Sequence, residues 1–136
     1  RSGEGVSYGG SWKAPAARFL DLRIDTRTGK AVFYVQRLIP VRIEMLNPNV
    51  EDIRIVRAAI LKPKTELKGQ DLPVLTKGQA TNVRLDCYFD KSALGQEELV
   101  LQFVYEIAGE ERVMEMKLAA EFKSAVTGGS SLKDLK

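Results

Sequence analysis

The sequence predicts an all-β fold, a two-sheet antiparallel sandwich of about seven strands in an immunoglobulin-like arrangement. Three observations predict it. Apolar side chains recur at every second position along most of the chain, the period of a strand with one buried face. Glycine, proline and asparagine separate these segments at short intervals. No segment sustains the 3.6-residue apolar period of an amphipathic helix. A small β-barrel of similar strand number is the alternative.

The length of 136 residues is that of one domain, and it can bury enough surface to fold without a disulfide or a metal. We expect the sandwich to occupy residues 17–126. A glycine-rich flexible arm is predicted at residues 1–16, and a flexible tail at residues 127–136. Tyr8 and Trp12 interrupt the arm. They are either docking residues for a partner or anchors that fold back over a sheet edge.

The first alternating segment contains Leu20, Leu22 and Ile24, which are separated by charged residues. Residues 26–30 supply a turn with a glycine, and residues 31–35 are rich in β-branched and aromatic side chains. The simplest interpretation is a hairpin that joins these two segments.

Residues 41–45 alternate again and end in the Asn-Pro-Asn sequence of residues 47–49, which is typical of a turn. A further strand is predicted from Ile53 onward. Its apolar phase slips at Val56 and Arg57, which indicates a β-bulge or a strand that passes between the sheets.

Residues 62–78 contain two prolines, two glycines and several lysines, which predicts a long connection with at most a short edge strand at residues 72–75. Residues 83–89 then alternate clearly, and residues 90–98 are predicted to include a brief helical turn. The strongest pattern comes last. Alternating residues 99–107 and 114–122 flank a glycine-containing turn, which predicts a β-hairpin.

Composition excludes several kinds of chemistry. The chain has no histidine and one cysteine, so it has no Ser-His-Asp or Cys-His catalytic set, no histidine-ligated metal and no intrachain disulfide. Cys87 falls on the inward series of its strand and is expected to pack in the core. The candidate acidic residues fall on outward positions: Asp21, Asp25, Glu44, Asp86, Glu115 and Glu121.

We therefore expect no catalytic residues, no metal site and no cofactor. The enzymatic alternative is a hydrolase that uses only two carboxylates, as many glycosidases do. The longest apolar runs, residues 31–35 and 58–61, are far shorter than the roughly 20 residues that span a bilayer as a helix.

The predicted function is a non-catalytic protein-interaction or scaffolding module of a larger assembly, which binds a partner through a sheet edge or an outer sheet face. The partner is another copy of the chain or another subunit, with Tyr8 and Trp12 as candidate contacts. The alternative is a polyanion- or carbohydrate-binding domain that uses outward basic residues, if Arg42, Arg54 and Arg84 share one face. Nucleic acid is not an expected partner, because the 21 basic residues are interleaved with 18 acidic ones.

Overall fold

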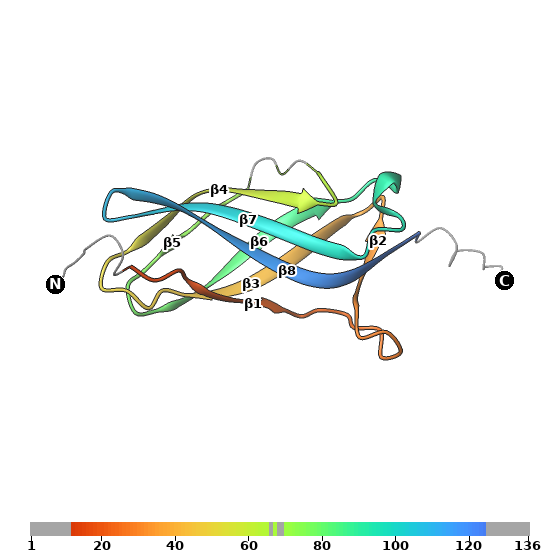
Figure 1. Ribbon diagram of the computed structural model, residues 1–136, viewed down its shortest axis with the longest axis horizontal. Helices are drawn as coiled ribbons and strands as arrows, with labels where there is room; N and C mark the ends of the chain where they lie inside the picture. Colours follow the sequence, from red (N-terminus) through yellow and green to blue (C-terminus); the bar gives the residue numbers. More distant parts are fainter. Residues whose placement is uncertain (1–11, 66, 68–69, 125–136) are drawn as a thin grey trace.

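The computed structural model describes residues 12–65, 67 and 70–124, and this part of the chain folds into two β-sheets packed face to face (Figure 1). Eight strands and one 3-10 turn are described: β1 (Ala16–Leu20), β2 (Ala31–Val35), β3 (Leu38–Leu46), β4 (Ile53–Lys62), β5 (Val74–Leu75), β6 (Ala80–Tyr88), η2 (Lys91–Ala93), β7 (Glu98–Ile107) and β8 (Glu110–Ser124). The predicted all-β two-sheet sandwich is confirmed, with eight strands in place of about seven. The helical element η2 is three residues long, so no helix in the described residues could cross a membrane.

The smaller sheet has the strand order β1-β3-β6, and the larger sheet has the order β2-β8-β7-β4-β5. Among the described strands, the pairing is antiparallel as predicted except at one place. β2 runs parallel to the end of β8, in a register that pairs Ala31 with Ala120 and Val35 with Ser124. A strand adds to a parallel neighbour only through a long crossover, and here residues 36–119 lie between the two partners.

The predicted hairpin between the first two segments is present only as a short antiparallel contact that closes the turn at residues 26–30. β1 begins at Ala16, ends at Leu20 and pairs with β3, whereas β2 belongs to the other sheet. Among the described residues, one isolated bridge between Ile24 and Ala31 links the two segments. Asp21 adopts a left-handed conformation with φ 57° directly after the last residue of β1, so the strand does not continue into residues 23–25.

Other local predictions are confirmed. The phase slip in β4 corresponds to a shift of register against β7 between Ile55 and Arg57. The hairpin of β7 and β8 closes at Ala108 and Gly109, which have φ of 50° and 79°, as a two-residue type I′ turn requires. Among its described residues, the connection after β4 contains the short edge strand β5, and η2 lies in the predicted helical turn.

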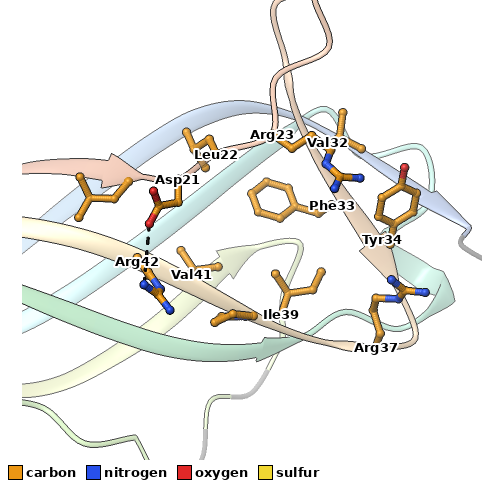
Figure 2. A pocket seen from close by; sticks show the side chains of 12 residues that line it. Asp21, Leu22, Arg23, Val32, Phe33, Tyr34, Arg37, Ile39, Val41 and Arg42 are labelled. Carbon is orange, nitrogen blue, oxygen red and sulfur yellow. Dashed lines mark ion pairs between the residues drawn. The ribbon is translucent and has the colours of Figure 1, made fainter.

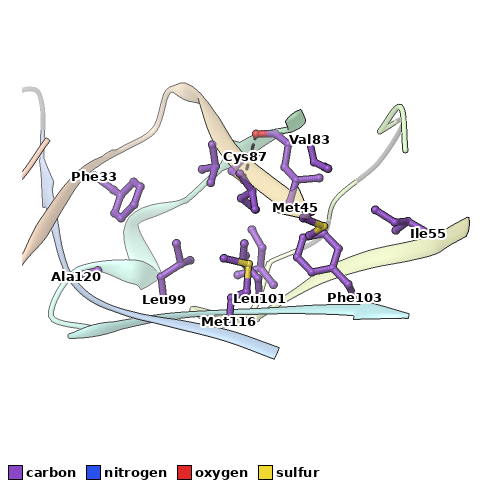
Figure 3. Close-up of a cluster of buried hydrophobic side chains, with 14 of the residues drawn as sticks. Phe33, Met45, Ile55, Val83, Cys87, Leu99, Leu101, Phe103, Met116 and Ala120 are labelled. Carbon is purple, nitrogen blue, oxygen red and sulfur yellow. Dashed lines mark hydrogen bonds between the residues drawn. The ribbon is translucent and has the colours of Figure 1, made fainter. Parts of the chain in front are cut away.

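The core lies between the two sheets and is built from the predicted inward series of β6, β7 and β8 (Figure 3). Leu101 and Phe103 of β7 are almost completely buried, and Cys87 of β6 faces them from the other sheet. At one end, Phe33, Phe89 and Phe122 form an aromatic cluster with ring centroids 5.0 to 5.9 Å apart. This cluster ties β2 to the rest of the core.

At the other end, the Asn-Pro-Asn turn is a buried polar network. The Nδ2 of Asn47 donates to the carbonyl oxygens of Glu51 and Leu75, each at 2.9 Å, and its Oδ1 accepts from the backbone N–H of Asn49 at 2.9 Å. Asn49 in turn exchanges two 2.8 Å hydrogen bonds with the backbone of Lys13. The turn therefore holds β5 and the start of the described chain together.

Candidate functional site

The outer side of β8 is the longest exposed strand edge in the described structure. β8 is 15 residues long, and β2 pairs with its last five residues, from Ala120 to Ser124. Within the described residues, no strand pairs with the outer side of the preceding part, Glu110–Ala119. We call Glu110–Ala119 the open edge.

The turn geometry determines which backbone groups face this open edge. A two-residue turn makes Ile107 and Glu110 a hydrogen-bonded pair, and such pairs alternate along an antiparallel ladder. The N–H of Ala120 donates to the carbonyl oxygen of Glu97 at 3.0 Å, so even-numbered residues direct their backbone groups toward β7. The backbone groups on the outer side therefore belong to the odd-numbered residues: Glu111, Val113, Glu115, Lys117 and Ala119.

A groove of about 590 Å³ lies between the open edge and β1. β1 pairs with β3 on one side only, so it is an edge of the other sheet, and it lies alongside β8 in Figure 1. Apolar side chains from both strands and the adjoining loop form much of the groove, and these partly buried residues also pack against the core: Ala17, Phe19, Leu22 and Met114. Met116, which is buried, lies beside them.

The groove has the chemistry of an adaptable apolar surface with a polar rim. Methionine has an unbranched, polarizable side chain that fits different apolar shapes, and two of the chain's three methionines line the groove. Arg18, Glu115 and Lys117 form the rim. Such a surface suits an extended chain that buries every second side chain while its backbone pairs with β8.

Parts of other edges of the two sheets are covered. The side chain of Gln70 accepts from the backbone N–H of Asp86 at 2.9 Å and donates to its carbonyl oxygen at 3.2 Å, which imitates a paired strand along β6. Thr65 donates to the carbonyl oxygen of Tyr88 at 3.0 Å on the same edge. β5 pairs with the first two residues of β4, Ile53 and Arg54. Uncovered edges invite pairing with other chains, and the open edge combines ten residues without a strand partner with an adjoining apolar groove.

The three predicted arginines do not share one face. Arg42 of β3 and Arg84 of β6 are direct cross-strand partners on the outer face of the smaller sheet. Arg54 lies on β4 in the other sheet. Each arginine has a carboxylate nearby: Asp21 at 3.9 Å from Arg42, Glu106 at 2.7 Å from Arg54 and Asp86 at 3.0 Å from Arg84. These pairs reduce the positive potential that a polyanion would meet.

Of the two aromatic candidates, Trp12 is partly buried and packs against the core. The neighbouring Lys13 is held by Asn49, so the contacts of Trp12 favour its interpretation as an anchor. Tyr8 lies outside the described residues. Residues 12–16, which we had expected in the arm, contact the sandwich or begin β1.

Cys87 lies in the core, away from the groove. Its side chain is inaccessible to solvent, and its Sγ donates to the carbonyl oxygen of Leu85 at 3.7 Å. Burial, assisted by the negative charge of Asp86, raises the pKa of the Cys87 thiol to about 12. A thiol with this pKa remains protonated and unreactive near neutral pH. Within the described ranges, no group of three or more cysteine, aspartate or glutamate side chains is placed to hold a metal ion.

Comparisons with known proteins identify no relative. No family model matches the chain, and no curated protein matches it. Its functional surfaces must therefore be inferred from its own residues. The open edge was not predicted from the sequence, although one signal was present. Charged residues at 111, 115 and 117 alternate with methionines at 114 and 116, which is the pattern of an edge strand with one apolar face.

Proposed function

We propose that this chain is a non-catalytic protein-interaction module that binds an extended segment of a partner protein along the open edge of β8. The observation that carries the proposal is the set of outward backbone groups of Glu110–Ala119, which have no strand partner and lie beside an apolar groove. Small β-sandwiches commonly bind peptides by adding a strand to such an edge.

The bound segment would form backbone hydrogen bonds with residues such as Val113, Glu115 and Lys117. Ten residues of open edge correspond to about 30 Å of extended chain, which is room for a segment of similar length. Every second side chain of the segment would enter the groove against Phe19 and Met114. We therefore expect a preference for alternating apolar residues, with tolerance for their exact shape because of the methionines.

The test begins with linear peptides selected on the wild-type protein from an unbiased display library. The selected peptides are then measured against Glu115→Pro and Glu115→Ala. Proline removes a backbone N–H that faces the open edge, and β7 does not use this N–H, so the fold should tolerate the change. Glu115→Ala removes the side chain and keeps the N–H.

We expect Glu115→Pro to weaken binding by at least about tenfold, because a backbone hydrogen bond and its neighbours are lost, while Glu115→Ala changes it by less than about threefold. Amide resonances of Val113 and Lys117 should shift on binding. Two results would contradict the proposal: peptides that bind the proline variant as tightly as the wild type, or peptides that shift the amide resonances of residues on another surface.

A second copy of the chain is the other possible occupant of the open edge. Sedimentation of the wild type over a range of concentrations distinguishes this case. Dimerisation that Glu115→Pro abolishes would identify self-association as the use of this edge. A monomer that binds the selected peptides would identify a heterologous partner.

A further inference from the structure

A second hollow, of about 230 Å³, lies where the chain leaves β1 and crosses through β2 to β3 (Figure 2). Two left-handed residues shape this crossover. Asp21 has φ 57° directly after β1, and Gln36 has φ 63° between β2 and β3. The N–H of Gln36 donates to the carbonyl oxygen of Phe89 at 2.7 Å, which holds the second bend against the core. The walls of the hollow are therefore fixed by the fold.

The floor of this hollow is apolar. Phe33 of β2 and Val41 of β3 are almost completely buried, and Ile39 is partly buried against the core. These three side chains come from the two sheets and meet below the rim (Figure 2). Because they are held by core packing, they form a preformed surface for an apolar group.

The rim carries an excess of positive charge. Arg23, Arg37 and Arg42 line the hollow together with a single carboxylate, that of Asp21, which lies 3.9 Å from Arg42. In the described part of the chain, no carboxylate lies within ion-pair distance of Arg23 or Arg37. The guanidinium of Arg37 lies over the ring of Tyr34, 5.6 Å from its centroid, which holds this charge beside the opening.

We infer that this hollow binds a small amphipathic carboxylate, with its apolar body on Phe33, Ile39 and Val41 and its charged group against Arg23 and Arg37. Guanidinium groups hold carboxylates through charge-assisted, often bidentate hydrogen bonds. A cavity of about 150 Å³ accommodates benzene, so this larger hollow is suited to a monocyclic aromatic or a medium-chain aliphatic acid. The site is separate from the open edge, although Leu22 lines both hollows.

The test is a titration of the full chain, followed by amide resonances, with octanoate, benzoate, 1-octanol and inorganic phosphate as probes. We expect saturable shifts at Phe33, Tyr34 and Arg37 with octanoate or benzoate. Octanol, which lacks the charge, and phosphate, which lacks the apolar body, should each bind at least about tenfold more weakly.

Variants locate the site. The double variant Arg23→Gln/Arg37→Gln should weaken octanoate binding by at least about tenfold, and Ile39→Ala should weaken it several-fold through the lost apolar contact. Arg54→Gln is the matched control, because Arg54 is an exposed arginine on the other sheet, and it should bind octanoate like the wild type. Thermal unfolding of each variant confirms that the fold is intact.

Three results would overturn the inference: no saturable shift with either acid up to about 10 mM, the usual limit of weak specific binding; equal binding of octanol or phosphate; or an equal loss in Arg54→Gln. None of these results bears on peptide binding at the open edge, which Glu115→Pro tests. The two hypotheses can therefore fail separately.

Discussion

Asn47 is fully buried, although asparagine usually lies at the surface. The Asn-Pro-Asn sequence predicted a turn at this place, and the turn is present. The sequence could not predict that the Asn47 amide also bonds to Leu75, because that contact joins residues 28 positions apart. A local pattern specifies backbone shape, whereas a distant hydrogen-bond partner depends on the assembled sheets.

Replacement of Asn47 by alanine should lower the free energy of unfolding by about 2 to 3 kcal/mol, because the buried bond to the Leu75 carbonyl and the partly buried bond to the Glu51 carbonyl are lost. Asn47→Asp should be more destabilising at pH 7 than at pH 3, since an ionised carboxylate cannot donate to the carbonyls of Glu51 and Leu75. Urea unfolding at the two pH values measures both effects. Equal stability of wild type and Asn47→Ala would contradict the role of this network.

The inward position of Cys87, in contrast, was predicted from alternation alone, since Val83, Leu85 and Phe89 share its phase. In the native protein, Cys87 should react with a thiol reagent many times more slowly than in denaturant, because its side chain is inaccessible. The ratio of the two labelling rates at pH 7.5 measures this protection. Rapid native labelling would mean that the face assignment of β6 is reversed.

The raised pKa of Cys87 also predicts a dependence of stability on pH. The unfolded thiol ionises near its ordinary value of 9.0, and the buried thiol near about 12, so the unfolded state loses its proton first. The stabilisation of the folded state by the protonated thiol is fully present below pH 9. It is lost between pH 9 and 12, at up to about 1.4 kcal/mol per pH unit. Burial also raises the pKa of Tyr105, which acts in the same direction.

Comparison with Cys87→Ala separates the two groups. The variant keeps Tyr105 and lacks the thiol, so its stability should fall less steeply with pH over the alkaline range. Urea midpoints measured for both proteins at pH 8, 9.5 and 11 give the two slopes. Parallel slopes would show that the buried thiol has little influence on alkaline unfolding.

Among the elements, those defined by clear alternation and a strong turn signal were predicted well. The hairpin of β7 and β8, the short edge strand β5 and the bulge in β4 all follow from local sequence. The first predicted hairpin is present only as a short contact between residues 23–25 and 30–32, and there is a physical reason. Leu20 and Leu22 alternate, yet Asp21 between them takes a left-handed conformation, and β1 finds its partner in β3. Alternation identifies a buried face without identifying the neighbouring strand.

Substitutions along the β7 and β8 hairpin test the face assignment. Leu101→Ala and Phe103→Ala should each lower the free energy of unfolding by about 2 to 5 kcal/mol, the usual loss when a large buried side chain is removed and leaves a cavity. Leu118 is in the predicted inward series of residues 114–122 but is only partly buried, so Leu118→Ala should lower the free energy of unfolding by about 1 to 2 kcal/mol. Lys117 is exposed, so Lys117→Ala should lower the free energy of unfolding by less than about 0.5 kcal/mol. Denaturant midpoints for the four variants give this order directly.

At the scale of the whole molecule, the sequence predicted the two sheets and most of the core but not the order of strands. Strand order decides which edges remain unpaired, and the candidate site depends on it. The open edge exists because β2 joins the far end of β8 in parallel and leaves Glu110–Ala119 uncovered. The groove beside it needs β1 as an edge of the other sheet. Neither contact has a local sequence signal, since the partners are far apart in the chain.

The start of the sandwich is also a property of the whole molecule, because Trp12 and Lys13 contact residues that follow them by many positions. A chain that begins at Pro15 should be less stable by about 1 to 3 kcal/mol than one that begins at Trp12, since it loses the partly buried indole and two hydrogen bonds to Asn49. Urea unfolding followed by circular dichroism compares the two chains.

Trp12 is the only tryptophan, so its fluorescence reports the same contact independently. In the chain that begins at Trp12, the native emission should lie at shorter wavelength than in urea, because the indole packs against the core. Trp12→Ala in that chain should cause part of the stability loss expected for the chain that begins at Pro15. Lys13→Ala keeps the backbone groups that Asn49 binds, so it should have little effect on stability. If the two truncated chains unfold at the same urea concentration, then Trp12 does not anchor the chain, and its interpretation as a docking residue for a partner becomes the better one.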